Sequence, residues 1–498
     1  MEDVRKKIFK NSSLWIFSFV FQQLVRFLIV YLIAHFFGKS VFGAYSMVLT
    51  FVAFFTLISR HGWEYSFIKY VQYYIVKGRF GKLKGMLLSG FTIPLFFSLC
   101  LVFILYLNRN FFIRNFFKGE YDKFFYLLLF FIPIHTLLQL TLYFIEGLKH
   151  SGTRALLERV GITFLHLLLL LLLSGLGSMS TILSYFFAST VVLFVSFYVG
   201  IRILKGENIF KRIKYAKAVI NIGNEFKYGL NLFSDAFINF LINRMDILFL
   251  GFFAFLGDVG VYSLTTRLTM VLILFYSAFD SILTPIISEN FARKDFKSIE
   301  KLYREITWWG IALTIPLAIF YFLMGKELLL FFGKGFDKGF WALLILTVAQ
   351  LVNVLVGSAG NIVAVCGYPK LSFYNSFSVA ILSIILNLTL IPKYGVLGVA
   401  ISTGSSIFVL NFLRGIELYI IFKLHPFNKA YFSILFASFV AATVGYFFKN
   451  YFLGEIFRIF AVAFLVFVSY IFVFIIAMPR NSRIFLVDFL KRKNKSDL

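Results

Sequence analysis

The tetrapeptide TIPL occupies residues 92–95, and the same four residues return at 314–317. Each copy lies inside a long apolar run. Two further segments recur in the same order and about 220 residues apart: GAYS at 43–46 returns as GVYS at 260–263, and GLG at 175–177 resembles GVLG at 395–398. Because three matches share one order and one spacing, the chain is predicted to contain two copies of one structural unit.

The composition places both copies in a membrane. Of the 498 residues, 60% are hydrophobic and 14% are charged, and the mean hydropathy is +0.87. Soluble domains contain about 45–50% apolar and about 25% charged residues, because even a large globule needs a polar surface. The composition therefore excludes a soluble enzyme, a nucleic-acid-binding domain and a disordered protein. It predicts an all-α polytopic membrane protein.

The charge balance is strongly basic, with 49 Lys and Arg against 23 Asp and Glu and a net charge of +26. In a membrane protein this excess is typical of cytoplasmic loops, so no nucleic-acid partner is expected. The two cysteines, Cys100 and Cys366, are far apart in sequence and indicate neither a disulfide framework nor a metal site. The basic N-terminus precedes an apolar run without a small-residue cleavage site, which predicts a retained first span.

The number of spans follows from the apolar runs, because a helix needs about 20 apolar residues to cross a bilayer. Continuous rather than alternating apolar character excludes barrel strands. Polar, Gly and Pro breaks divide the chain into about fourteen predicted transmembrane helices, at 14–37, 43–70, 86–107, 124–146, 156–174, 180–203, 228–255, 259–288, 306–325, 340–365, 371–391, 396–421, 430–448 and 456–478.

The orientation of these spans is predicted from Lys and Arg on alternate loops. One side carries 31 such residues and the other carries 10. Since the basic side of a membrane protein is cytoplasmic, both termini are predicted to be cytoplasmic, with the chain in the cytoplasmic (inner) membrane.

The repeat and the span count together predict the domain organisation. Each copy holds six spans, so both copies have one orientation and are related by an axis along the membrane normal, as in parallel-repeat transporters. The predicted parts are an N-lobe at 1–203, a basic cytoplasmic linker at 204–227, a C-lobe at 228–421, two appended spans at 422–478 and a basic amphipathic tail at 479–498.

Polar residues inside the spans predict a hydrated cavity, because ionisable groups at bilayer depth usually face a bundle interior. On helical wheels they form stripes on the first two spans of each repeat. The members we assign to the cavity are Gln22, Arg26, Arg60, Glu64, Asn231, Asp235, Asn239, Asn243, Asp246, Thr266, Arg267 and Asp280. Arg60 and Glu64 can pair at i,i+4 or reach the headgroups as helix-end residues. Arg244 lies off the stripe of its own helix and can face a neighbouring helix instead.

The fourth span adds His135, Gln139 and Glu146 on one face. A single histidine in such a span is more often a packed structural residue than a proton carrier. The prolines at 94 and 316 can bend their helices, although such kinks are common in membrane spans.

Two stretches resemble the O-antigen (Wzx-like) polysaccharide-biosynthesis flippases of the multidrug/oligosaccharidyl-lipid/polysaccharide exporter superfamily. One is NRMDI at 243–247, followed by Gly251 and GVY at 260–262. The other is GYPK at 367–370, followed by Asn387, IPKYG at 391–395 and GVA at 398–400. The resemblance covers roughly residues 8–425, and its motifs are moderately specific.

The resemblance implies a MATE-like exporter fold, and a function as a flippase for an undecaprenyl-pyrophosphate-linked oligosaccharide. Alternating access would move the headgroup between leaflets. Arg26, Arg60, Arg244 and Arg267 are then the candidate cations for the pyrophosphate, because guanidinium binds phosphate oxygens in a bidentate manner. Asp235, Asp246 and Asp280 are candidates for a coupling proton or sodium ion, and no other cofactor is expected. The expected partners are the lipid-linked oligosaccharide, membrane lipids and other polysaccharide-assembly proteins, with a functional monomer.

Three alternatives remain open from the residues. A multidrug cation antiporter has the same fold, but its cavity should be net acidic. The lipid II flippases usually carry Asp-Ala-Phe and Ile-Pro-Asn segments between spans 1 and 2, where this chain has GKSVFGAY at 38–45. A membrane polymerase or glycosyltransferase would need an outer-face acid or a large outer loop. No Gly-rich phosphate loop, metal cluster or nucleophile triad is present in the sequence, so primary ATP-driven transport is not expected. The protein is expected to be a transporter and not an enzyme.

Overall fold

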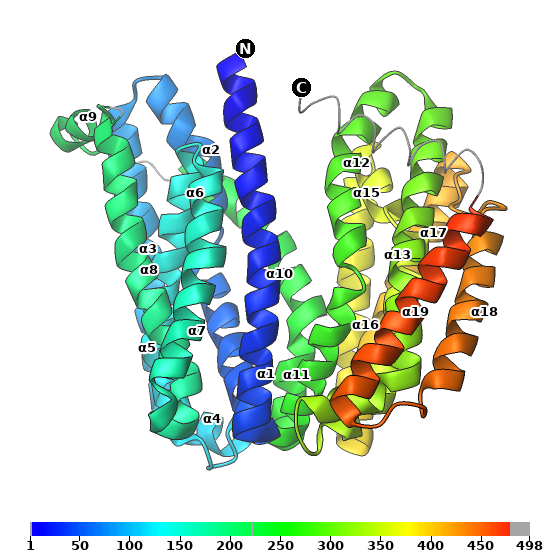
Figure 1. The fold of residues 1–498 in the computed structure, drawn as a ribbon. Helices are drawn as coiled ribbons and strands as arrows, with labels where there is room; N and C mark the ends of the chain where they lie inside the picture. The colour runs from blue at the N-terminus through cyan, green and yellow to red at the C-terminus, as the bar shows by residue number, and fades with distance from the viewer. Residues whose placement is uncertain (1, 207, 221–222, 479–498) are drawn as a thin grey trace. The chain divides into compact units, whose positions relative to one another are not determined.

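The computed structural model describes residues 2–206, 208–220 and 223–478, and every regular element in these residues is a helix (Figure 1). The amphipathic tail predicted at 479–498 lies outside the described residues. The chain divides into two compact units, residues 1–260 and 261–498, and each is described by itself.

Unit 1 is a bundle of helices joined by short turns. A π-helical turn, η1 (Leu156–Gly161), and a 3-10 turn, η2 (Ser174–Met179), flank α7. The helices are α1 (Glu2–Arg60), α2 (Trp63–Val76), α3 (Phe80–Leu107), α4 (Arg109–Phe116), α5 (Asp122–Gly147), α6 (Ser151–Ala155), α7 (Ile162–Leu172), α8 (Ser180–Gly206), α9 (Ile209–Tyr215) and α10 (Gly223–Phe253).

Helix α1 is too long to cross a bilayer once, and it is broken where the sequence predicts the end of the first span. Gly38 has φ 79° and ψ 175°, a conformation outside the helical region that glycine adopts without steric cost. A second break follows at His61 (φ 48°) and Gly62 (φ 83°). The span predicted at 43–70 is therefore interrupted, and its last part belongs to α2.

The core of unit 1 lies where α2, α3, α5 and α8 meet. Trp63 and Phe67 of α2 are buried there with Leu140 and Phe144 of α5, and Ile209 of α9 joins the same cluster. These helices contact one another through large aromatic and aliphatic side chains, and in a bilayer such contacts stabilise the bundle by close van der Waals packing. The cluster fixes the position of α5, which with α1 and α10 surrounds the candidate site.

Unit 2 contains the remaining helices. Helix α11 (Leu256–Val271) begins in unit 1 and ends in unit 2, and the break at 272–273 separates it from α12. The span predicted at 259–288 is thus formed by two helices rather than one. The others, with the 3-10 turn η3 (Phe336–Gly339), are α12 (Leu274–Ala292), α13 (Phe296–Phe331), α14 (Phe340–Val356), α15 (Ala359–Val365), α16 (Pro369–Tyr394), α17 (Val396–Phe422), α18 (Tyr431–Phe448) and α19 (Glu455–Ala477).

Within unit 2, α13 packs against α14, α18 and α19, and α17 packs against α14 and α16. One buried cluster joins Ile287 of α12, Tyr303 of α13, Ile362 of α15 and Leu418 of α17. The Tyr303 hydroxyl donates to the backbone carbonyl of Val356 at 2.6 Å, so its polar atom is satisfied inside an apolar cluster.

The glycines of the GxYS repeat lie where two helices come into close contact. A Cβ at Gly43 would overlap the backbone carbonyl of Leu256, and a Cβ at Gly260 would overlap that of Lys39. The backbones of α1 and the start of α11 therefore touch, and small residues allow such close approach in membrane bundles. The tyrosines of the two motifs, Tyr45 and Tyr262, are both buried.

The structure confirms an all-α, multi-pass membrane protein. Among the described residues, 12 helical segments are long and apolar enough to cross a membrane. One of them, Phe17–Arg60, contains the break at Gly38, so the count is consistent with the predicted number of about fourteen. Many aromatic side chains are exposed, including Phe194, Phe432 and Phe447, as lipid-facing residues are. The domain boundaries predicted from the repeat remain a prediction.

Candidate functional site

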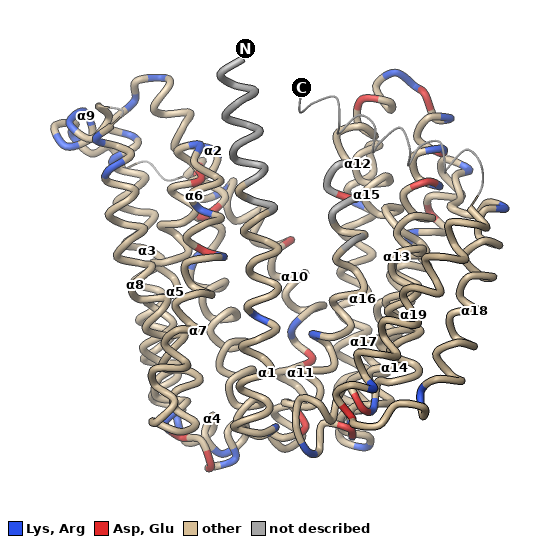
Figure 2. Tube along the Cα trace, viewed as in Figure 1, with Lys and Arg blue, Asp and Glu red and all other residues tan. Residues whose placement is uncertain are grey.

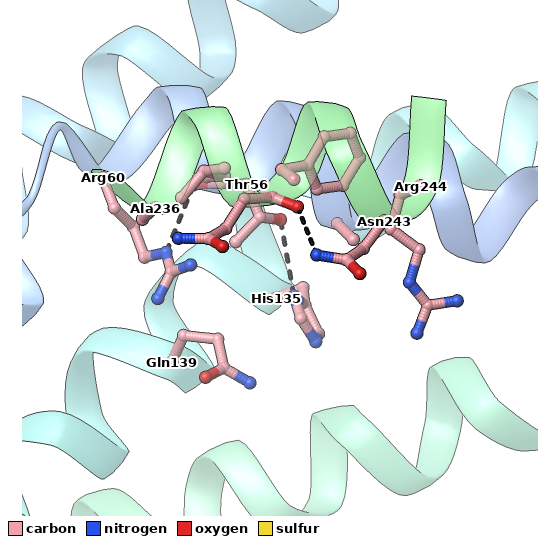
Figure 3. Close-up of a pocket in the computed structure, with 11 residues that line it drawn as sticks. Thr56, Arg60, His135, Gln139, Ala236, Asn243 and Arg244 are labelled. Atoms are coloured by element: carbon pink, nitrogen blue, oxygen red, sulfur yellow. Dashed lines mark hydrogen bonds between the residues drawn. The ribbon is translucent and has the colours of Figure 1, made fainter. Parts of the chain in front are cut away.

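A pocket of ≈ 340 Å³ lies within unit 1 between α1, α5 and α10 (Figure 3). Polar side chains from three helices line it together with small and apolar ones. The lining residues are Ala53, Thr56, Leu57 and Arg60 of α1, His135 and Gln139 of α5, and Ala236, Asn239, Phe240, Asn243 and Arg244 of α10. Figure 3 shows Arg60, Asn243 and Arg244 directed toward the space that His135 and Gln139 occupy.

Arg60 is held at the end of α1 by its own helix and by an acid. Its Nε donates to the backbone carbonyl of Thr56 at 3.3 Å. Its Nη1 lies 3.3 Å from Oε1 of Glu64, which is 1% exposed. The i,i+4 pair expected from the sequence is therefore formed, and it neutralises a buried carboxylate. Among the described residues, Oε2 of Glu64 has no hydrogen-bond partner, so Glu64 depends strongly on Arg60.

An aromatic ring links this pair to a second charge cluster. The Tyr143 ring lies 5.8 Å from the guanidinium carbon of Arg60 and 3.9 Å from that of Arg154. Arg154 in turn pairs with Glu146 and with Glu158, the latter at 3.2 Å. Glu146 is therefore an ion-pair partner within unit 1. Cation–π contacts and opposite charges together restrain the side chains beside the pocket.

His135 and Gln139 form the α5 side of the pocket. Nδ1 of His135 lies 3.4 Å from the Thr56 hydroxyl, and Gln139 follows one helical turn later. The sequence analysis favoured a packed structural histidine, and the structure places His135 at the pocket wall. An imidazole and an amide supply both donors and acceptors, which are the groups that sugar hydroxyls require.

Helix α10 contributes amides and one cation. Asn243 donates through Nδ2 to the carbonyl of Asn239 at 2.8 Å, and Asn239 donates in the same way to that of Asp235. These bonds within the helix leave the amide oxygens as acceptors. Arg244, which the helical wheel placed off the polar stripe, has an accessible side chain and lines the same pocket as Asn239 and Asn243.

Further cations lie within electrostatic range of Arg244. The charge of Arg244 is attracted by that of Asp246 and, to a smaller extent, repelled by that of Arg26 on α1. Arg26 also repels Arg159 of η1, which Glu158 attracts. Arg159 was not among the predicted site residues: it lies in the span predicted at 156–174, but it was counted with the basic residues of the cytoplasmic side. The structure places it in η1, which continues into α7. Like charges brought together in a membrane protein favour an anion between them.

The remaining predicted residues lie elsewhere. Gln22 is buried in α1, while Asn231 and Asp235 are exposed on α10 outside the pocket. Asp246 is 5% exposed and accepts a bond from the backbone N–H of Ile247, so it also lies outside the pocket. The other three belong to unit 2: Thr266, Arg267 and Asp280. In the described part of the chain, no three His, Cys, Asp or Glu residues are grouped as metal ligands would be.

We expect water to reach the pocket face of α10 and not its packed face. In a Cys100- and Cys366-free variant, Asn243→Cys should react rapidly with a small polar thiol reagent in intact membranes. Ile238→Cys, on the same helix but 8% exposed, should react at least tenfold more slowly. Equal reactivity at the two positions would contradict the assigned orientation of α10.

The family and fold comparisons agree with this architecture. The family model described as polysaccharide biosynthesis protein matches residues 8–291, and the MatE model matches residues 235–389. An uncharacterised membrane protein of Methanocaldococcus jannaschii is 20% identical over 82% of this chain and 83% of its own. A probable low-salt glycan biosynthesis flippase of Haloferax volcanii, Agl15, is 25% identical over 37% of this chain and 40% of its own.

Solved structures show the same fold. The lipid II flippase MurJ in an inward closed conformation aligns with a TM-score of 0.72 at 18% identity, covering 96% of this chain and 99% of its own. An inward-facing multidrug resistance MATE family transporter of the MOP superfamily aligns with a TM-score of 0.57 at 14% identity, covering 80% and 98%. Because the polysaccharide biosynthesis model matches more than half of the sequence, this chain belongs to the polysaccharide biosynthesis protein family.

Proposed function

We propose that this protein is a flippase. It moves an undecaprenyl-pyrophosphate-linked oligosaccharide from the inner to the outer leaflet of the cytoplasmic membrane by alternating access, with both termini in the cytoplasm. The observation that carries the proposal is the pocket of unit 1, where Arg60 and Arg244 lie among amides and an imidazole. The family and the flippase names of the Haloferax volcanii relatives support the same conclusion.

The pocket chemistry suits both parts of such a headgroup. A pyrophosphate is a dense anion, and guanidinium groups bind phosphate oxygens with two parallel hydrogen bonds. Sugar hydroxyls are matched by the amides of Gln139, Asn239 and Asn243. The lipid tail carries no group that these cations and amides bind, so it stays in the bilayer while the headgroup crosses.

A cationic drug is the less suitable cargo. The ionisable groups that line the pocket itself are Arg60, His135 and Arg244, and none of them is an acid. An organic cation would therefore be repelled unless it were paired with an anion. This lining therefore favours the flippase proposal over a multidrug antiporter, which would have the same fold.

Reconstitution tests the proposal directly. Vesicles containing the purified protein receive a fluorescent, short-chain polyprenyl-pyrophosphate-linked oligosaccharide in both leaflets, and a membrane-impermeant reductant then bleaches the outer leaflet. With active protein the whole pool should become bleachable, whereas protein-free vesicles protect the inner-leaflet fraction. A glycolipid that stays protected, together with uptake of an organic cation by the same vesicles, would replace the flippase with the antiporter.

The same vesicles test whether an ion gradient drives flipping. We propose Asp235, Asp246 and Asp280 as the carboxylates for a coupling proton or sodium ion. Asp280 accepts a hydrogen bond from the Tyr276 hydroxyl at 3.3 Å and another from Asn361 within unit 2. An imposed pH or sodium gradient should accelerate flipping if one of these ions is coupled to it.

A further inference from the structure

A dense group of cations covers one end of unit 1, around α9 and the turn between α2 and α3 (Figure 2). We call this group the basic platform; its members are Lys77, Arg79, Lys82, Lys205, Lys211, Arg212, Lys214 and Lys217. All of them are exposed except the half-buried Lys82. None is assigned to the pocket, which is formed by other helices.

Helix α9 lies flat on the bundle because one of its faces is apolar. Ile209 is buried, and Phe210 and Ile213 pack against the cluster formed by α2, α3, α5 and α8. The opposite face presents Lys211 and Lys214 to the outside. This is the amphipathic pattern of a helix packed on a bundle surface, and it leaves the cationic face available to a ligand.

Backbone contacts hold the platform in place. Nζ of Lys84 donates to the carbonyls of Lys214 and Ala216, at 2.9 and 3.0 Å. The backbone N–H of Val219 donates to the carbonyl of Gly81 at 3.0 Å. The cations of α9 are therefore fixed beside those of the α2–α3 turn, and their mutual repulsion is present before any ligand binds.

The charges of the platform are almost unopposed. Residues 77–84 contain four basic and no acidic residues, and residues 205–217 contain five basic residues and one acidic residue. Such a surface attracts an extended ligand that carries many negative charges. Large apolar side chains lie at its edge, since Val76, Tyr215 and Ile220 are 71%, 80% and 68% exposed.

The exposed apolar side chains at the edge of the platform indicate which kind of anion it binds. A soluble acidic protein or a free phosphate would leave these three side chains in water. A bilayer surface accepts them at the boundary between headgroups and acyl chains, where aromatic and aliphatic side chains of interfacial helices are found. The platform also adjoins the start of α3 and the end of α8, and both of these helices are long and apolar enough to span the membrane.

We propose that the basic platform binds the headgroups of anionic phospholipids in the leaflet at this end of unit 1. Phosphate oxygens accept bonds from Lys211, Arg212 and Lys214, while Tyr215 enters the interface. The site keeps α9 on the membrane surface. It does not depend on the flippase proposal, because it requires only that unit 1 is in a bilayer.

Lipid titration of the purified protein tests the site. A fluorophore at Ala216→Cys, in a Cys100- and Cys366-free variant, is quenched by nitroxide-labelled phosphatidylglycerol or phosphatidylcholine in mixed micelles. We expect stronger quenching by phosphatidylglycerol and weakening by salt. The triple variant Lys211→Ala/Arg212→Ala/Lys214→Ala should raise the half-saturating phosphatidylglycerol fraction by at least tenfold. The expected loss is about fivefold per cation removed, from about 1 kcal/mol each.

The matched control removes three cations at the other end of unit 1, at and after α4: Arg109→Ala/Arg114→Ala/Lys123→Ala. Glu120 and Asp122 already offset the charge there, and Arg109 stacks on Tyr106 as Arg212 stacks on Phe80. This control should change quenching by less than twofold. Should the platform triple variant elute as aggregate, Lys211→Gln alone should show the single-cation effect. Equal quenching by the two lipids, or equal effects of the two triple variants, would overturn the proposal.

Discussion

Replacing Arg244 by Ala should abolish flipping of the pyrophosphate-linked glycolipid while the amount and thermal stability of the protein stay unchanged. The side chain is accessible and lines the pocket, so its removal leaves no cavity among packed side chains. Its charge also attracts that of the buried Asp246, and the double variant described below measures that contribution. The transport reaction loses two charge-assisted hydrogen bonds to phosphate, each contributing about 1.5–3 kcal/mol. We therefore expect the initial flipping rate in reconstituted vesicles to fall by about 100-fold or more.

Lysine at position 244 should restore only part of this rate, because it returns the charge without the planar fork that binds two oxygens. Arg26→Ala should act in the same direction, since Arg26 lies within electrostatic range of Arg244. The opposing interpretation is that Arg244 serves Asp246 structurally. In that case Arg244→Ala would disappear from the membrane, and a second change, Asp246→Asn, would restore both protein and transport.

Arg60 offers a contrast within the same pocket. Its removal leaves Glu64 buried without its cation, which typically costs about 3–5 kcal/mol. Arg60→Ala should therefore lower thermal stability as well as transport. Adding Glu64→Gln should recover the stability and not the transport, so that the structural and the substrate-binding roles of one arginine are measured separately.

The fold was largely predictable because bilayer thickness sets the length of an apolar helix. The all-α membrane architecture and the approximate number of spans follow from the lengths of the apolar runs. The interruptions at His61 and Gly62 and at 272–273 were not predicted, because they depend on local backbone conformation inside continuous apolar sequence. Hydropathy averages over such breaks, and single residues with positive φ do not change it.

For the candidate site, the sequence could predict which face of each helix is polar, but not which helices meet. Polar stripes drew attention to Arg60, Asn239 and Asn243, which the structure places in one pocket together with Arg244. A helical wheel gives the direction of a side chain from its own axis, but it does not show which helices face each other. The length of an arginine side chain also lets Arg244 reach a pocket that its Cα direction alone did not indicate.

Arg159 shows a different limit. Counting basic residues assigns each one to the loop nearest to it, and this treatment places Arg159 among the charges that set topology. The structure holds it in η1, a π-helical turn, within electrostatic range of Arg26. Turns of this kind are frequent at functional sites, but their hydrogen-bond pattern leaves no periodic signal in the sequence.

Gly229→Ala should destabilise the protein more than any other single-methyl change that we propose. Helix α10 is anchored to α2 near this residue, where the Ser66 hydroxyl donates to the carbonyl of Glu225 at 2.6 Å and Tyr74 donates to the Glu225 carboxylate. A Cβ at position 229 would lie 2.5 Å from the carbonyl oxygen of Gly62 and 2.9 Å from Oγ of Ser66. Backbone atoms cannot move aside as a flexible side chain can, so α10 must shift.

Overpacking of this kind costs about 1–3 kcal/mol, more than the gain of up to about 1 kcal/mol from the better helix propensity of alanine. We expect the midpoint of thermal unfolding in detergent to fall by about 2–4 °C. Gly200→Ala is the matched control, because its Cβ would make only ordinary contacts, with the Phe144 ring at 3.5 Å and Cγ1 of Ile145 at 4.0 Å. Its midpoint should stay constant or rise. Since α10 carries Asn239, Asn243 and Arg244, its displacement should also slow glycolipid flipping in the surviving protein. An unchanged midpoint and rate for Gly229→Ala would show that α10 does not touch the α1–α2 turn as closely as the structure places it.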